Sequence, residues 1–288
     1  RLTAEEALLF PVKDAWLYHE KTPLGGRGKA NQGDNFYYAE NPPYGVVFTY
    51  YLKESLQTLA QKRRDAEEKA KEEGERIGYP DWDELRAEDR ERAPEIWFHI
   101  TDESGELVRQ IKGRDSRGIH RVAWDMHYPP VSPASTKPWS PSRPWSTPPR
   151  SHLAAPGRYA VTLVKREGDV TTPLAGPRTF QLTPLGWATL PTEDWEGLHT
   201  FQRQVADLHR SVQGAIRPAG EAKERLEHIR VALRDTPGIE PNRAAALVDR
   251  TRSLELRLAD LRTELDGDRT ISKRHEPGPV SIRERISQ

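Results

Sequence analysis

The feature of this sequence that most constrains its fold is a change in the spacing of its apolar residues near Pro191. Before this point, short segments alternate apolar and polar side chains, which is typical of half-buried β-strands. After it, apolar residues recur at steps of three and four, which indicates amphipathic helices. The sequence therefore predicts an α+β protein with a β domain over 44–190 and a helical domain over 191–267.

The alternation is clearest from Glu95 to Thr101, where Ile96, Phe98 and Ile100 share one face. Residues 102–105 are typical of a hairpin loop whose glycine has a positive φ. Further strands are predicted over 44–52, 106–111, 119–125, 158–165 and 179–182. Several short strands separated by turn residues predict an antiparallel β-sandwich. Residues 1–43 are expected to form an irregular linker.

A highly charged segment, residues 53–92, interrupts this β domain with 10 basic and 13 acidic side chains. Mixed charges at i,i+4 spacing and strong helix formers predict one helix over 53–76 and a second over 81–90. Because these helices offer little apolar face, we expect a solvated insert that is available for external contacts.

Residues 129–149 contain 8 prolines and two tryptophans, Trp139 and Trp145, which predicts an extended loop. Exposed indole rings are candidates for stacking on sugars or for binding a protein partner. The favoured alternative is that the loop folds back and packs both rings against the sandwich, because an ordered loop needs anchors to offset its lost entropy.

Three helices are predicted in the second domain. Arg217-Pro218 and Thr236-Pro237-Gly238 are expected to end the first two, Pro241 to begin the third and Gly267 to end it. The short connections predict an antiparallel three-helix bundle, followed by an extended tail over 268–288. The same spacing also drives coiled coils, so association between copies remains an alternative to packing within one chain. The seam residues are Leu198, Phe201, Val205, Leu208, Val212, Ala215, Ala222, Leu226, Ile229, Leu233, Leu247, Thr251, Leu254, Leu258, Leu261 and Leu265.

Composition excludes several classes of protein. The 44 basic and 44 acidic side chains balance, which argues against a general nucleic-acid binder. Without cysteine, the chain has no disulfide, thiolate nucleophile or cysteine zinc site. No apolar run approaches the ~20 residues that span a membrane. Because the chain begins with Arg1, we interpret it as a mature product or a fragment.

Motifs that could carry catalysis or bind a metal are incomplete. The glycine-rich residues 25–29 depart from a phosphate loop at Pro23 and Ala30, and favour a flexible linker. On one strand, His120 faces away from Asp125 and His127, so a metal would need a bend and a further ligand.

The remaining catalytic motifs are weaker still. His199 and His209 lie ten residues apart, unlike the zincin spacing, and are expected to flank the helical seam. No motif selects two carboxylates for glycoside hydrolysis, and no nucleophile elbow is present. We therefore predict no catalytic residue, metal or cofactor in this chain.

Two segments carry a resemblance to a known fold. Residues 118–125, a long loop and then residues 155–163 resemble the FlgD-like immunoglobulin sandwich. There a Trp-Asp pair ends one strand and a Pro-Gly-x-Tyr motif begins the next. The resemblance implies structural roles for Trp124, Asp125, Gly157 and Tyr159.

Segments 41–53, 101–109 and 267–282 extend the resemblance, over roughly residues 8–286, to secreted bacterial proteins with sortilin-like, BNR-repeat β-propellers, which are named glycosyl hydrolases. Gly278 stands where those proteins typically have threonine. The resemblance implies a propeller ahead of residue 1 as partner, an extracytoplasmic location and a non-catalytic accessory or assembly role. The alternatives are a part of a glycoside hydrolase that adds aromatic substrate contacts, and a structural subunit of an extracellular assembly.

Overall fold

A computed structural model describes residues 6–19, 39, 41–136, 139–141, 146, 148–186 and 194–287. The chain divides into two compact units. The first, Arg1–Tyr128 with Leu153–Trp195, is called the sheet unit here, and the second, Pro129–His152 with Glu196–Gln288, the helical unit. The proline-rich loop thus groups with the helices and not, as expected, with the sheets.

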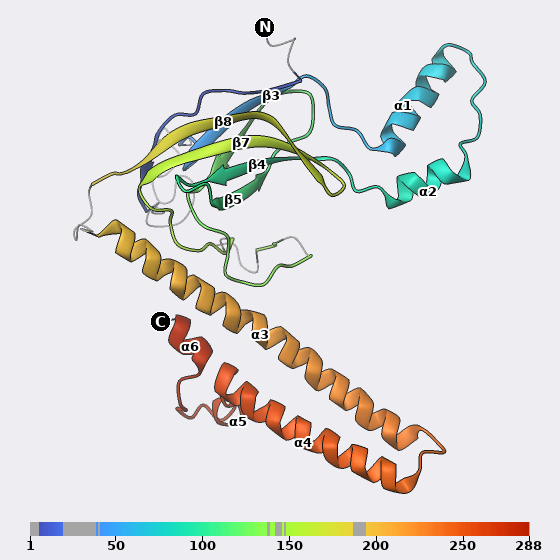
Figure 1. Cartoon of the computed structure of the whole chain (residues 1–288), viewed down its shortest axis with the longest axis vertical. Coiled ribbons are helices and arrows are strands. Elements are labelled where there is room, and N and C mark those ends of the chain that lie inside the picture. Colours follow the sequence, from blue (N-terminus) through green and yellow to red (C-terminus); the bar gives the residue numbers. More distant parts are fainter. Residues whose placement is uncertain are drawn as a thin grey trace, which may run out of the picture. The chain divides into compact units, whose positions relative to one another are not determined.

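The sheet unit contains two sheets (Figure 1). The smaller sheet has the order β1-β3-β6, with β1 (Ala7–Leu9), β3 (Val46–Leu52) and β6 (Gly118–Trp124). The larger has the order β2-β8-β7-β4-β5, with β2 (Ala15–Leu17), β8 (Val170–Pro184), β7 (Gly157–Glu167), β4 (Glu95–Thr101) and β5 (Leu107–Lys112). With the helices described below, this confirms the α+β class.

One hydrophobic core joins the two sheets. Phe48 of β3 and Phe98 of β4 stack across it with their ring centroids 5.5 Å apart. The predicted inward face of β4 is confirmed, because Ile96, Phe98 and Ile100 are fully buried. Residues 102–105 form the expected β4–β5 turn, in which Gly105 has a φ of 84° and the Asp102 carboxylate accepts bonds from the backbone of Ser104 and Glu106.

Two expectations for the strands are wrong. The lead-in is not wholly irregular, since β1 and β2 bury Leu9 and Leu17 in the core. Strands of three residues are too short to show a period, so their pairing with β3 and β8 decides them. The strands are also not all antiparallel, because β2 runs parallel to β8.

Strand β8 is far longer than the predicted 179–182 segment. Its first half carries Pro173 and Pro177, which are rare inside regular strands because proline cannot donate a ladder bond. In the structure the β7–β8 pairing shifts register near Val161 to Val164, opposite this proline-containing stretch. A bulged ladder tolerates residues that a regular one does not.

The charged insert forms two helices, as predicted. Helix α1 (Leu59–Glu72) begins at a Thr58–Gln61 capping box, and α2 (Trp82–Arg90) begins at an Asp81–Glu84 capping box. Neither helix has a buried residue. The link between them is electrostatic: both Nε and Nη2 of Arg63 donate to the carboxylate of Glu88, at 2.6 and 3.0 Å.

The helical unit contains two long helices, α3 (Trp195–Asp235) and α4 (Pro241–Asp266), and two short ones, α5 (Arg269–Ser272) and α6 (Ile282–Ser287). The third predicted helix is confirmed as α4, with Pro241 in its first turn and Gly267 at its C-cap. The break predicted at Arg217-Pro218 is wrong, since α3 runs through Pro218. Two long helices therefore stand where a three-helix bundle was expected.

The heptad spacing explains why α3 continues. Its apolar seam keeps one register on both sides of Pro218: Val205, Val212, Ala219, Leu226 and Leu233 follow one another at intervals of seven. If one helix ended at Pro218 and another began after it, the apolar residues of the second would not need to keep the seven-residue register of the first. Sustained burial along one seam offsets the local penalty of an interior proline.

The tail is not fully extended either. Ser281 and Glu284 form reciprocal bonds at the start of α6, with Ser281 N donating to Glu284 Oε2 at 2.9 Å and Glu284 N donating to Ser281 Oγ at 3.3 Å. This Ser-x-x-Glu pattern is a capping signal that the sequence analysis overlooked. Arg283 then joins α6 to α4 through an ion pair with Asp266 at 2.7 Å. No helix in the described part of the chain is sufficiently long and apolar to span a membrane.

Candidate functional site

The four residues expected to be structural lie at one end of the core. Trp124 is fully buried, and its indole Nε1 donates to the carbonyl of His127 at 3.1 Å. Its ring meets that of Tyr159 edge-on, with centroids 5.6 Å apart. The Tyr159 hydroxyl donates to the carbonyl of Ala155 at 2.8 Å, just before β7 begins at Gly157. These contacts close the turn into β7.

Asp125 and His127 stabilise the segment that follows Trp124. The Asp125 carboxylate accepts the His127 backbone N–H at 3.2 Å, and Nδ1 of His127 lies 2.7 Å from the Asp125 carbonyl. His120 lies apart from them, with its Nε2 2.7 Å from the Ser116 carbonyl. Among the described residues, no three His, Cys, Asp or Glu side chains gather as a metal site would require.

Shifted pKa values in the sheet unit belong to groups that pack or pair. Burial raises the pKa of Tyr159 and also that of Tyr50. A hydrogen bond from Lys112, with a second from the Trp97 indole, lowers the pKa of Glu95. These groups are spread over both sheets, so they do not form a constellation for acid–base catalysis.

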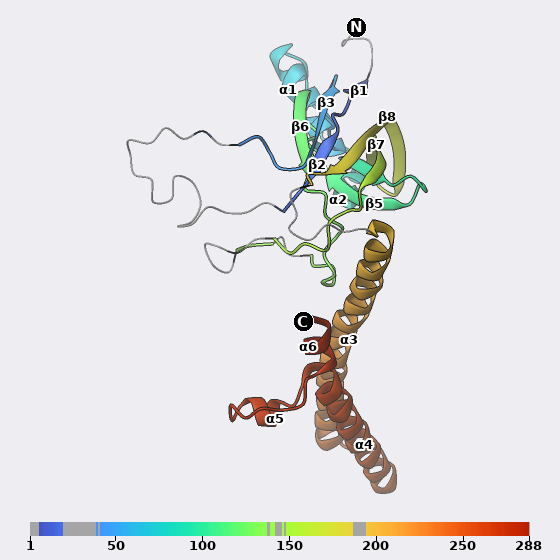
Figure 2. The same ribbon diagram turned by 90° about the vertical axis from the view of Figure 1, so that its left-hand side faces the viewer.

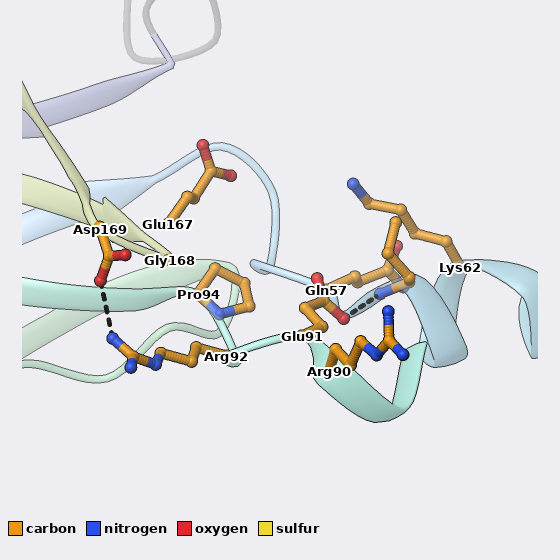
Figure 3. Close-up of a pocket in the computed structure, with 10 residues that line it drawn as sticks. Gln57, Lys62, Arg90, Glu91, Arg92, Pro94, Glu167, Gly168 and Asp169 are labelled. Atoms are coloured by element: carbon orange, nitrogen blue, oxygen red, sulfur yellow. Dashed lines mark hydrogen bonds and ion pairs between the residues drawn. The ribbon is translucent and has the colours of Figure 1, made fainter. Parts of the chain in front are cut away.

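A cavity of about 570 Å³ lies where the insert meets the β7–β8 turn (Figure 3). Arg92 and Asp169 pair across it at 2.7 Å, and the backbone N–H of Leu59 donates to Glu91 at 2.7 Å. Basic and acidic side chains line it in equal number: Lys62, Arg90, Arg92, Glu91, Glu167 and Asp169. With no dominant sign of charge, it is not suited to capturing a charged ligand.

Of the two tryptophans in the proline-rich loop, the structure describes only Trp139. Trp139 is 46% exposed, so its ring is not fully packed away as the favoured interpretation held. Trp145 lies outside the described residues, as does the glycine-rich segment 25–29. Near the end of the loop, the His152 ring contacts that of His199 on α3, with centroids 5.5 Å apart. This contact joins the end of the loop segment to α3 within the helical unit.

An exposed aromatic pair in the insert was missed by the sequence analysis. Tyr79 and Trp82 have their ring centroids 6.0 Å apart and are 79% and 64% exposed. The sequence signal that could have identified them is two large aromatic residues directly after a charged helix, in a segment whose apolar residues have no regular spacing.

The helical unit carries a group of exposed apolar side chains at regular spacing. Helices α3 and α4 lie side by side and antiparallel, with Arg230 Nε 4.0 Å from a Glu255 carboxylate oxygen (Figures 1 and 2). Each helix has two apolar rows. The inner row comprises Val205, Val212, Ala219, Leu226 and Leu233 on α3, and Ala244, Thr251, Leu258 and Leu265 on α4; the outer row comprises Phe201, Leu208, Ala215, Ala222 and Ile229 on α3, and Leu247, Leu254 and Leu261 on α4.

The two rows differ in burial. All inner-row residues are buried or half-buried. Every large side chain of the outer row remains 39–62% exposed, with Phe201 and Leu261 the most exposed. The expected seams are thus real, but packing within the helical unit covers only one row of each. His209, expected beside the seam, is half-buried and lies 3.2 Å from the side-chain amide of Gln213.

Comparisons with known proteins identify no relative of this chain, so its function has to be argued from the geometry described above. No protein-family model matches the chain, and no curated protein or solved structure is significantly similar to it.

Proposed function

We propose that this chain is a non-catalytic module for protein–protein association and domain docking. The observation that carries the proposal is the outer row, because regularly spaced leucines exposed on two neighbouring helices are a surface that a helical or apolar partner would cover. Most other exposed side chains of α3 and α4 are charged or polar, which keeps such a surface soluble before docking.

The partner class follows from the resemblance to the C-terminal region of secreted β-propeller proteins. We infer that the module accompanies such a propeller in an extracytoplasmic protein, and that the sheet unit is an immunoglobulin-like, FlgD-like sandwich. Two features support the sandwich assignment: a buried tryptophan at the core, Trp124, and a tyrosine whose hydroxyl bonds to the backbone a few residues upstream, Tyr159.

Two measurements on the purified chain test this function. Incubation with a panel of glycosides should give no turnover, and robust hydrolysis would overturn the non-catalytic assignment. Titration calorimetry against a purified sortilin-like, BNR-repeat β-propeller of the kind that the resemblance implies should detect binding. Failure to bind would remove the propeller as partner.

A sugar-binding role is the second candidate, and the exposure of Trp139 favours it. A half-exposed indole offers an apolar plane for stacking on a sugar ring. Affinity electrophoresis in polysaccharide gels should then show retardation that Trp139→Ala abolishes. Trp82→Ala is the matched control, because Trp82 is an exposed tryptophan of the insert. Equal mobility of Trp139→Ala and the unaltered chain would reject this role.

A further inference from the structure

The outer rows of α3 and α4 share one face of the helical unit. Antiparallel neighbours turn in opposite senses when viewed along a common axis, so residues offset equally from the contact seam fall on the same side of the pair. The outer row precedes the inner row by four residues on both helices, as Leu208 precedes Val212 and Leu254 precedes Leu258. The exposed leucines therefore form one apolar face that is two helices wide.

This face has the size of a stable interface. Helix α4 has 26 residues and spans about 39 Å at 1.5 Å per residue. Two packed helices are about 20 Å wide, so the face measures roughly 800 Å². A standard protein–protein interface buries about this area on each partner.

We propose that a second copy of this chain occupies the face, so that two α3–α4 pairs form a four-helix bundle about a twofold axis. The proposal rests on the association function proposed above and names the partner. A seven-residue repeat fits only a helix with the same repeat, because each side chain must enter a hole between four residues of the facing helix. The outer row itself supplies that repeat, and a twofold axis makes one patch complementary to itself.

Charge along the border of the face favours one arrangement. On α4 the border carries Arg243, Arg250, Arg257 and, near the end of the helix, Glu264, whereas on α3 it carries two acids, Asp207 and Glu221, and one arginine, Arg225. A twofold axis parallel to the helices places α4 of one copy beside α3 of the other, and all neighbouring helices are then antiparallel. Arg257 of α4 then lies at about the level of Glu221 on α3 of the other copy, so this basic and this acidic side chain can pair.

The test is the mass of the full chain by light scattering and sedimentation equilibrium from about 1 to 100 μM. We expect a particle of twice the 32.8 kDa chain mass. The double variant Leu254→Glu/Leu261→Glu should raise the dissociation constant at least 100-fold. Its matched control is Leu256→Glu, which alters a leucine of α4 that is 49% exposed but lies on another face, and should leave the dimer intact.

Charge reversal tests the arrangement of the helices. Arg257→Glu should weaken the dimer about tenfold, and the further change Glu221→Arg in the same chain should restore it. Failure of the restoration would refute the placement of α4 beside α3 of the other copy.

Three results would overturn the proposal: a monomer at every concentration, an assembly larger than a dimer, or a dimer that survives the outer-row change. A monomer that still binds the propeller would leave the association function standing. A monomer that the outer-row variant destabilises to heat would show that the face packs against the same chain.

Discussion

Replacing Gly45 by alanine should destabilise the sheet unit more than the same change at two other glycines. Gly45 lies just before β3 with a φ of 100°, and a Cβ there would lie 1.9 Å from the carbonyl oxygen of Trp124. Gly105, in the β4–β5 turn, has a φ of 84° but no heavy atom within 4 Å of its Cβ position. The Cβ of an alanine at Gly113 would lie 2.9 Å from Oη of Tyr50. The three sites separate backbone strain from crowding.

The magnitudes follow from these geometries. At Gly105 only the left-handed backbone is penalised, which costs an L-residue about 1–2 kcal/mol. At Gly113 only crowding acts, and an overpacked core costs about 1–3 kcal/mol. At Gly45 both act, and the obstructing atom belongs to the strand paired with β3, so it cannot rotate aside. The loss there should reach about 4 kcal/mol or more, a large part of the ~5–15 kcal/mol that stabilises a domain.

Urea unfolding followed by near-ultraviolet circular dichroism measures these losses, because the packed aromatic side chains lie mostly in the core of the sheet unit. The far-ultraviolet signal at 222 nm reports the long helices and should change little in all three variants. If Gly45→Ala lost no more stability than Gly105→Ala, the close approach of β3 to Trp124 would be wrong. An unchanged m-value is needed for the comparison to hold.

Three further predictions concern single side chains. Pro218→Ala should raise the thermal midpoint of the 222 nm signal, because it restores a donor inside α3 and removes a penalty of up to about 3 kcal/mol; a lower midpoint would contradict the continuous helix. Tyr159→Phe should cost about 1–2 kcal/mol in urea, since the Ala155 carbonyl loses its donor, and an unchanged midpoint would argue against that bond. A hydrogen bond from Arg283 lowers the pKa of Asp266, so the contribution of this pair is present above about pH 4 and is lost as the pH falls through the lower folded value. Asp266→Asn should lower the protection factors of the amides of 282–287 at pH 7 to those that the unaltered chain shows in acid, and unchanged protection at pH 7 would refute the link.

Much of the candidate surface could be read from residue spacing. The seams on α3 and α4 follow from apolar steps of three and four, and the helices of the insert follow from their mixed charges and strong helix formers. Spacing could not show that the outer row stays exposed, because inner and outer rows have the same composition. That difference depends on how many helices pack together, which no local pattern records.

The short elements needed the tertiary structure for another reason. Strands β1 and β2 have three residues each, and their burial of Leu9 and Leu17 comes from pairing with β3 and β8. Strand β8 keeps Pro173 because the ladder shifts register there. In both cases the strand is formed by pairing with another strand, and the local sequence does not indicate this pairing.

The sequence by itself determined where the longer strands and the helical segments lie, since period two and period three-and-a-half reflect backbone geometry that every residue shares. It also determined the inward face of β4 and the ends of α4. Only the tertiary structure decided that α3 continues through Pro218, because the local penalty of the proline is offset there by burial of five seam residues spaced seven apart. It also decided which apolar row is covered, because a row is buried only when a neighbouring element packs against it.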